Sequence, residues 1–128
     1  MASRRKRFVR VEVGSTVKLT VEREPTTVPF VVEAEGYVGT LRNERWTSAQ
    51  LLGKTVSWKL AVEKRHRILL DLAFTSSTAA TAIVRVEIVK PDGTTHGEPW
   101  QLEISGQRPA VSDVIVTMFM LTGEEKPW

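Results

Sequence analysis

The sequence predicts an all-β fold: an antiparallel β-sandwich, Ig-like or jelly-roll, with about seven to eight strands and one short helical turn. Apolar residues alternate with polar ones along most of the chain, and turn residues such as Gly and Pro separate these stretches. A length of 128 residues, 41% of them hydrophobic, suits a single core. We therefore expect a basic N-terminal arm at 1–10, one sandwich domain at 11–122 and a C-terminal tail at 123–128.

Strands are expected where every second residue of a stretch is apolar. Gly14 and Ser15 either make a tight turn between the first two strands or bend one long strand, since glycine permits both. The stretches 68–74 and 114–121 are apolar on both parities, which is typical of strands covered on both sides. The expected strands lie at 9–13, 17–21, 28–34, 56–62, 68–74, 84–88, 100–104 and 114–121.

The segment 39–54 interrupts this alternation. Within it, Thr47 is followed three residues later by Gln50, which is the spacing of a capping box at the start of a helix. Two leucines and a glycine come next. The segment is therefore predicted to be a long connection that contains one short helical turn.

Positive charge is concentrated at the N-terminus. Residues 1–10 hold five of the 18 basic residues and none of the 15 acidic ones, so residues 11–128 carry 13 basic and 15 acidic side chains, a formal charge of −2. A flexible cationic arm can neutralise phosphates and release counterions, and Phe8 beside it can stack on an unpaired base. Alternatively, the run is a solvated tail or protects an edge strand from aggregation. The residues proposed for partner or nucleic-acid contact are Arg4, Arg5, Lys6, Arg7, Phe8 and Arg10.

Motifs for catalysis or for cofactor binding are missing from the sequence. The absence of cysteine removes thiolate nucleophiles and cysteine-ligated metals, and no glycine-rich phosphate loop or nucleophile elbow occurs. His66 and His96 are expected in loops rather than in a metal site. Asp71 interrupts an apolar strand and is expected to form a structural ion pair with an arginine. We expect a non-catalytic protein without cofactor or metal.

Two of the four tryptophans are candidates for surface contacts. Trp46 lies in the long connection and Trp128 is the last residue, whereas the other two share the parity of core residues. Tryptophan anchors many protein interfaces, so Trp46 and Trp128 are predicted to contact a partner. Alternatively, Trp46 binds a sugar ring with the help of Asn43 and Glu44.

These observations lead to three hypotheses about function. The first is a non-catalytic association module, a homo-oligomer held partly by its termini. The second is a nucleic-acid-binding or packaging protein that uses the basic arm, and the third is a carbohydrate- or small-ligand-binding module. No apolar stretch reaches the roughly 18 residues that span a bilayer, so no membrane partner is expected and the expected location is the cytoplasm.

Overall fold

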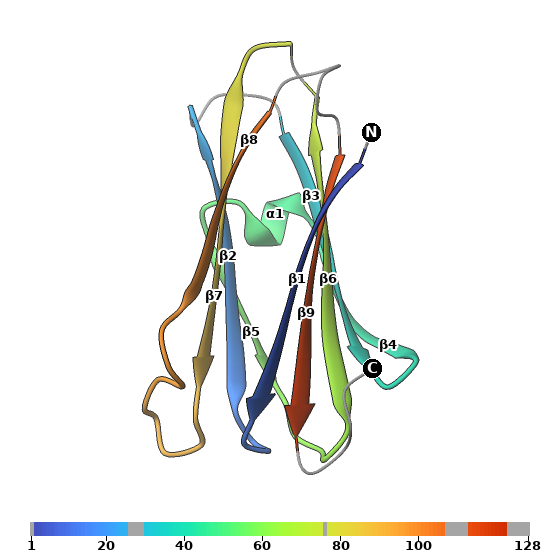
Figure 1. Ribbon diagram of the computed structural model, residues 1–128, viewed down its shortest axis with the longest axis vertical. Helices are drawn as coiled ribbons and strands as arrows, with labels where there is room; N and C mark the ends of the chain where they lie inside the picture. Colours follow the sequence, from blue (N-terminus) through green and yellow to red (C-terminus); the bar gives the residue numbers. More distant parts are fainter. Residues whose placement is uncertain (1, 26–29, 76, 107–112, 123–128) are drawn as a thin grey trace.

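The computed structural model describes residues 2–25, 30–75, 77–106 and 113–122, and in them the predicted all-β sandwich is confirmed. Two sheets pack face to face, and one short helix lies between them (Figure 1). The elements are β1 (Ala2–Val11), β2 (Thr16–Glu24), β3 (Phe30–Val38), β4 (Leu41–Trp46), α1 (Ser48–Leu51), β5 (Thr55–Lys59), β6 (Arg65–Phe74), β7 (Ala80–Val89), β8 (Trp100–Gly106) and β9 (Asp113–Thr122).

The larger sheet has the strand order β1-β9-β6-β3-β4, and the smaller sheet has the order β5-β2-β7-β8. Paired strands run antiparallel except β1 and β9, which run parallel. Because β1 and β2 belong to different sheets, the turn at Gly14 carries the chain across the sandwich and does not close a hairpin. Gly14 adopts a φ of 89°, which favours glycine, and its N–H donates to the Leu60 carbonyl at 2.7 Å.

The alternation of apolar and polar residues decides which side chains form the core between the two sheets. In β2, Val17, Leu19 and Val21 are buried, while Lys18 between them faces solvent. Burying such a side chain contributes about 1.5–3 kcal/mol of favourable transfer free energy. β6 and β9 lie side by side in the larger sheet. The prediction that both faces of a strand are covered is wrong for β6, whose outward residues are partly or largely exposed, whereas in β9 the outward Thr117 and Leu121 are buried.

The described residues form nine strands, one more than the largest number expected. The additional strand is β4, which lies in the segment predicted to be a connection. It is an edge strand, and Trp46 is the one residue of its six that is buried. Its sequence therefore lacks the apolar alternation that marks the other strands.

The helical turn predicted after Thr47 is confirmed as α1. The Gln50 side chain accepts a hydrogen bond from the Thr47 N–H at 3.0 Å, as a capping box requires. Ser48 Oγ bonds both the N–H and the carbonyl of Val32, at 2.9 and 3.0 Å, and Leu51 is buried. α1 thus carries the chain from β4 in one sheet to β5 in the other and fills that side of the sandwich (Figure 1).

The N-terminal residues differ most from the prediction. They form no separate arm, because Ala2–Val11 is the edge strand β1, paired in register with β9 from Ala2 opposite Asp113 to Val11 opposite Thr122. An edge strand with one face toward water lets a run of basic side chains join a sheet without burying their charge. The predicted C-terminal tail at 123–128, with Trp128, lies outside the described residues.

Candidate functional site

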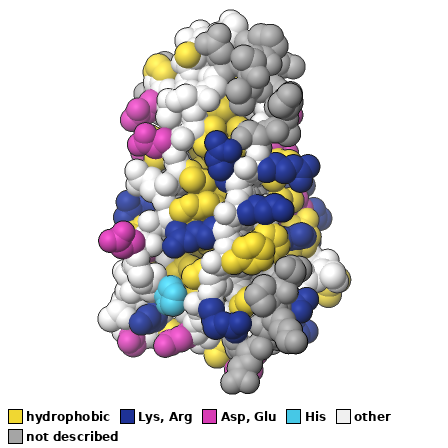
Figure 2. Space-filling view, viewed as in Figure 1, with side chains coloured by type: hydrophobic (Ala, Val, Ile, Leu, Met, Phe, Trp, Pro, Cys, Tyr) yellow, Lys and Arg dark blue, Asp and Glu magenta, His cyan; other side chains and the backbone are white. Residues whose placement is uncertain are grey.

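β1 turns its basic residues to two sides of the sheet edge. Successive side chains of a strand point to opposite faces of the sheet. The pairing of β1 with β9 therefore places every second side chain of β1 on the outer face of the larger sheet and the others toward β8 of the smaller sheet. In Figure 2, Lys and Arg side chains gather with hydrophobic side chains between them, over the front of the molecule where Figure 1 draws β1. The outward parity holds Arg4, Lys6, Phe8 and Arg10, all exposed, and the other parity holds Arg5, Arg7 and Val9.

Phe8 is the aromatic residue of this strand, and it is held flat against its neighbour. Its ring stacks on Phe119 of β9 with centroids 4.5 Å apart and planes 8° apart. Phe8 nevertheless remains 50% exposed, because the stack covers only one face of the ring. The ring therefore offers water a large apolar surface in a fixed orientation.

The row continues across the sheet with alternating aromatic and cationic groups. Arg67 of β6 is paired with Phe119, and Tyr37 of β3 is paired with Arg67. The Arg67 guanidinium carbon lies 4.4 Å from the centroid of the Tyr37 ring, within the range of a cation–π contact. We call the following residues the basic–aromatic face: Arg4, Lys6, Phe8, Arg10, Arg67 and Phe119.

Carboxylates limit this face at one end. Asp113 is paired with Ala2 at the start of β1, and Asp71 and Glu33 follow on the neighbouring strands. Burial raises the pKa of the Asp71 carboxyl, and the carboxylates of Asp113 and Glu33 raise this pKa further. The predicted ion pair between Asp71 and an arginine is wrong: among the described residues Asp71 makes no ion pair, and the neighbouring charges that shift its pKa are acidic.

Asp71→Asn is expected to stabilise the protein slightly at pH 7, because it removes a carboxylate that the fold disfavours. The pKa of Asp71 is raised by folding, so its penalty is fully present above the folded pKa and disappears below the ordinary value of 3.8. Thermal melts should show the advantage of the variant at pH 7 and its loss as the pH falls through the folded pKa. Glu103→Gln on the other sheet is the control, and an advantage that did not change with pH would contradict this account.

The inner side of β1 borders a small cavity between the two sheets. Its volume is about 120 Å³, and its lining includes Arg7 and Val9 of β1, Trp100 of β8, and His96 in the loop before β8. The guanidinium carbon of Arg7 lies 5.7 Å from the centroid of the Trp100 ring. The His96 N–H donates to the Ile88 carbonyl at 2.7 Å, whereas its ring Nδ1 is buried without a hydrogen-bond partner among the described residues.

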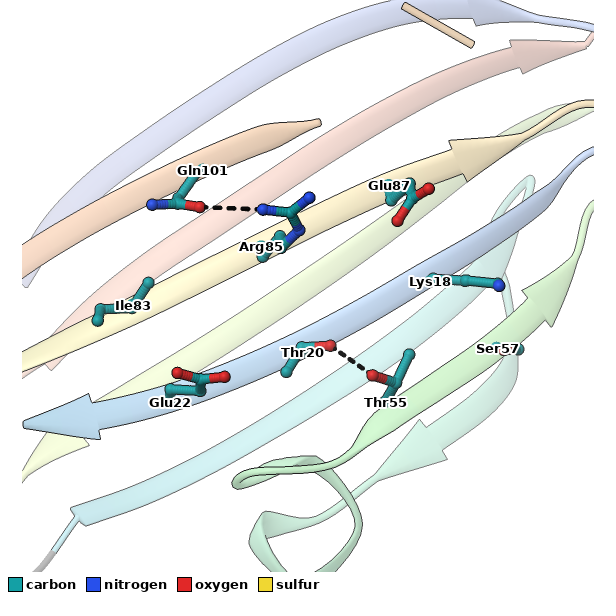
Figure 3. A pocket seen from close by; sticks show the side chains of 9 residues that line it. All are labelled: Lys18, Thr20, Glu22, Thr55, Ser57, Ile83, Arg85, Glu87 and Gln101. Carbon is teal, nitrogen blue, oxygen red and sulfur yellow. Dashed lines mark hydrogen bonds between the residues drawn. The ribbon is translucent and has the colours of Figure 1, made fainter. Parts of the chain in front are cut away.

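A larger groove of about 790 Å³ lies on the outer face of the smaller sheet (Figure 3). Its polar side chains already bond one another: Thr20 and Thr55 at 2.8 Å, and Arg85 and Gln101 at 3.3 Å. The charges are balanced, and the nine residues that line the groove include no aromatic ring. This groove has neither the net charge nor the stacking surface of the basic–aromatic face, so we regard it as the weaker candidate.

Two further residues lie elsewhere than predicted. Trp46, expected at an interface or a sugar site, is 7% exposed, and its ring meets that of Trp58 edge to face, with centroids 6.1 Å apart. His66, expected in a loop, lies in β6 and is 1% exposed, with Nδ1 2.9 Å from the Lys64 carbonyl. Both are therefore core residues. His96 does lie in a loop, as predicted.

The described ranges hold neither a candidate metal site nor a candidate membrane-spanning helix. Within the described ranges, no three His, Asp or Glu side chains come together in a way that could hold a metal ion. The helix in that part of the chain is too short to cross a membrane. Neither finding assigns a function.

Comparisons with protein-family models, with curated proteins and with solved structures found no match to this chain. The candidate site therefore depends on its own geometry. The sequence pointed to the β1 residues through their charge, but it gave no sign of Phe119 and Arg67. Only the pairing of β1 with β9, and of β9 with β6, brings these two residues beside the basic run.

Proposed function

We propose that this protein binds single-stranded nucleic acid on the basic–aromatic face, as a non-catalytic binding or packaging protein. The observation that carries the proposal is the half-exposed Phe8 ring, stacked on Phe119 between cationic side chains of the same strand. Basic side chains that follow the backbone, together with an aromatic platform for the bases, are the combination that single-strand binders use.

The charge of β1 favours a polyanion as the partner. The strand carries five basic residues and no acidic one, while the rest of the chain has a formal charge of −2. Phosphates would release counterions on binding to Arg4, Lys6 and Arg10, which gives affinity that depends on salt and little on sequence. An unpaired base can reach the exposed face of the Phe8 ring, whereas a base inside a duplex cannot, so a single strand is favoured over a double strand.

The positive charge of β1 disfavours direct association of two copies of the chain along this strand. Two copies that paired along β1 would bring identical cations together, and like charges placed opposite each other on strands are destabilising. Assembly of several copies along one nucleic-acid strand avoids this repulsion. The homo-oligomer and the cytoplasmic location remain predictions from the sequence, and the sugar-binding hypothesis loses its main residue because Trp46 is buried.

Phe8→Ala tests the proposal. Loss of the stacking surface is expected to weaken binding of a fluorescein-labelled ten-nucleotide DNA single strand about tenfold, since base–aromatic stacking is worth roughly 1–3 kcal/mol per base. Fluorescence anisotropy measures the affinity. The matched control is Leu41→Ala, which shortens another exposed hydrophobic side chain, on β4 at the far edge of the same sheet. Equal affinities of the two variants, or no binding by the intact protein, would refute the proposed function and leave the β1 cations as protection of a sheet edge.

A further inference from the structure

The exposed face of the Phe8 ring points off the edge of the larger sheet. Phe8 and Phe119 are paired across β1 and β9, and their rings have centroids 4.5 Å apart and planes within 8° of parallel. Neighbouring strands lie about 4.8 Å apart, so the two rings stand side by side on their strands and face each other along the sheet. The face of Phe8 that Phe119 does not cover therefore points away from β9, and no further strand of the described chain lies on that side of β1.

The rest of this row offers a base no comparable surface. Phe119, Arg67 and Tyr37 are all partly buried. Phe8, by contrast, is 50% exposed, and it covers one face of the Phe119 ring. The guanidinium of Arg67 lies over the Tyr37 ring, with its central carbon 4.4 Å from the ring centroid. The accessible ring of the basic–aromatic face is thus at its border, on the free edge of β1.

Cationic side chains lie on both sides of this edge. On the outer face, Lys6 and Arg10 flank Phe8, each two residues and therefore about 6.7 Å away along the strand. On the other side of β1, Arg5 is exposed, and its Nη1 donates to the Arg4 carbonyl at 3.3 Å, so its guanidinium lies beside the backbone of β1. Figure 2 shows Lys and Arg side chains on both sides of the stretch where Figure 1 draws β1. A polyanion that follows the edge can contact both rows, whereas one that lies across the outer face of the sheet does not reach Arg5.

We propose that the bound single strand runs along the free edge of β1, with one base stacked on Phe8 and its phosphates between the cations of the outer face and Arg5. This inference rests on the proposed function, because it gives the path of the strand that binds the basic–aromatic face. It adds Arg5 as a contact residue, and it confines the strand to β1 instead of leading it over Arg67 toward β3.

The path also defines the kind of strand that fits. The free face of the Phe8 ring is parallel to the edge, so a strand that follows the edge runs in the plane of the stacked base. In a stacked single strand the backbone instead follows the stacking direction, so the bound strand must be unstacked at Phe8. Sequence-tolerant binders show modest preferences, for pyrimidine runs for example, that come from stacking strength and backbone flexibility. The edge of β1 therefore suits pyrimidine-rich strands, which unstack easily.

The first test compares two variants that each remove one positive charge, Arg5→Gln and Arg67→Gln. Fluorescence anisotropy measures their affinity for a labelled ten-nucleotide thymidine strand, dT10, at several salt concentrations. Arg5→Gln is expected to lower the affinity severalfold at low salt and to reduce the magnitude of the salt slope by about 0.7, the contribution of one phosphate contact. Arg67→Gln should leave the affinity and the slope almost unchanged, and thermal melts verify that both variants are folded. If Arg67→Gln loses as much affinity as Arg5→Gln or more, or if Arg5→Gln loses none, the edge path is refuted.

The second test compares dT10 with the ten-nucleotide deoxyadenosine strand, dA10. The intact protein is expected to bind dT10 severalfold more tightly, and Phe8→Ala should weaken dT10 more than dA10, because only the intact ring requires an unstacked strand. Equal affinities of the intact protein for the two strands, or a preference that Phe8→Ala leaves unchanged, would contradict the edge path. If Phe8→Ala weakens dT10 and Arg5→Gln does not, the edge path is refuted and the nucleic-acid face stands. If neither strand binds the intact protein, both proposals are overturned.

Discussion

Replacing Arg4, Lys6 and Arg10 together by glutamine should weaken the binding of a single-stranded oligonucleotide on the order of 100-fold at low salt. All three side chains are exposed on the outward parity of β1, on the same face as Phe8. Each phosphate contact to a single strand contributes about 0.7 to the slope of log affinity against log salt concentration. The loss of three contacts should therefore reduce the magnitude of this slope by about 2.

The matched control removes the same charge from the opposite side of the molecule. Lys18, Lys54 and Lys59 are exposed on or beside strands of the smaller sheet, and glutamine at all three gives the same net charge as the first variant. This control should bind almost as tightly as the intact protein. Equal losses in the two variants would mean that only the net charge matters, which would contradict a site on β1.

Trp58→Ala should cost about 3–5 kcal/mol of unfolding free energy, a large share of the roughly 5–15 kcal/mol that stabilises a typical domain. Trp58 is 6% exposed and meets the rings of Trp46 and His66 edge to face, with centroid distances of 6.1 and 5.5 Å. A Cβ added to Gly36 would come within 3.1 Å of the Trp58 ring, so the indole lies directly on the backbone of β3. Its removal leaves a cavity that joins both sheets.

Trp58→Phe is the companion variant for this measurement. It keeps a ring in the core but loses part of the volume and the hydrogen bond from the indole Nε1 to Asn43, which is 3.3 Å long. Urea unfolding should rank the intact protein first, Trp58→Phe second and Trp58→Ala last. A loss below about 1 kcal/mol in Trp58→Ala would contradict the packing described for this cluster.

The sequence was sufficient to predict the sandwich because the alternation of apolar and polar residues indicates which face of each strand is buried. β2 and β7 follow the pattern closely, and the capping box at Thr47 marked α1 from its own residues. These features depend on local chemistry. Strand order and register do not, since they depend on which distant strands pair, and a single sequence does not encode that in any simple pattern.

The wrong predictions for the N-terminal run, Trp46 and His66 share one cause. A strand at the edge of a sheet, or the charged end of a strand, lacks the apolar alternation that marks a central strand. The basic run of β1 therefore resembles a free arm in the sequence, and Trp46 on β4 resembles a surface residue. The charged neighbours of His66 indicate a loop, although His66 lies on the same side of the strand as the buried residues Ile68 and Leu70. Parity alone would have placed it in the core.

The candidate site was only half visible in the sequence. The charge of residues 4–10 identified the strand, and Phe8 was noted beside it. The stacked partner Phe119 is more than a hundred positions away in the chain, and Arg67 joins only through β9. The alternating sides of β1, one toward Phe119 and one toward Trp100, likewise follow from strand pairing and not from the order of the residues.

The decisive experiment is titration of the intact protein with a labelled DNA single strand at several salt concentrations. Binding should weaken with salt, with a slope of about −2 to −3 from three or four phosphate contacts, and binding to the matching duplex should be weaker. If the intact protein binds no nucleic acid at low salt, or binds single strand and duplex equally, the basic–aromatic face is not a single-strand site.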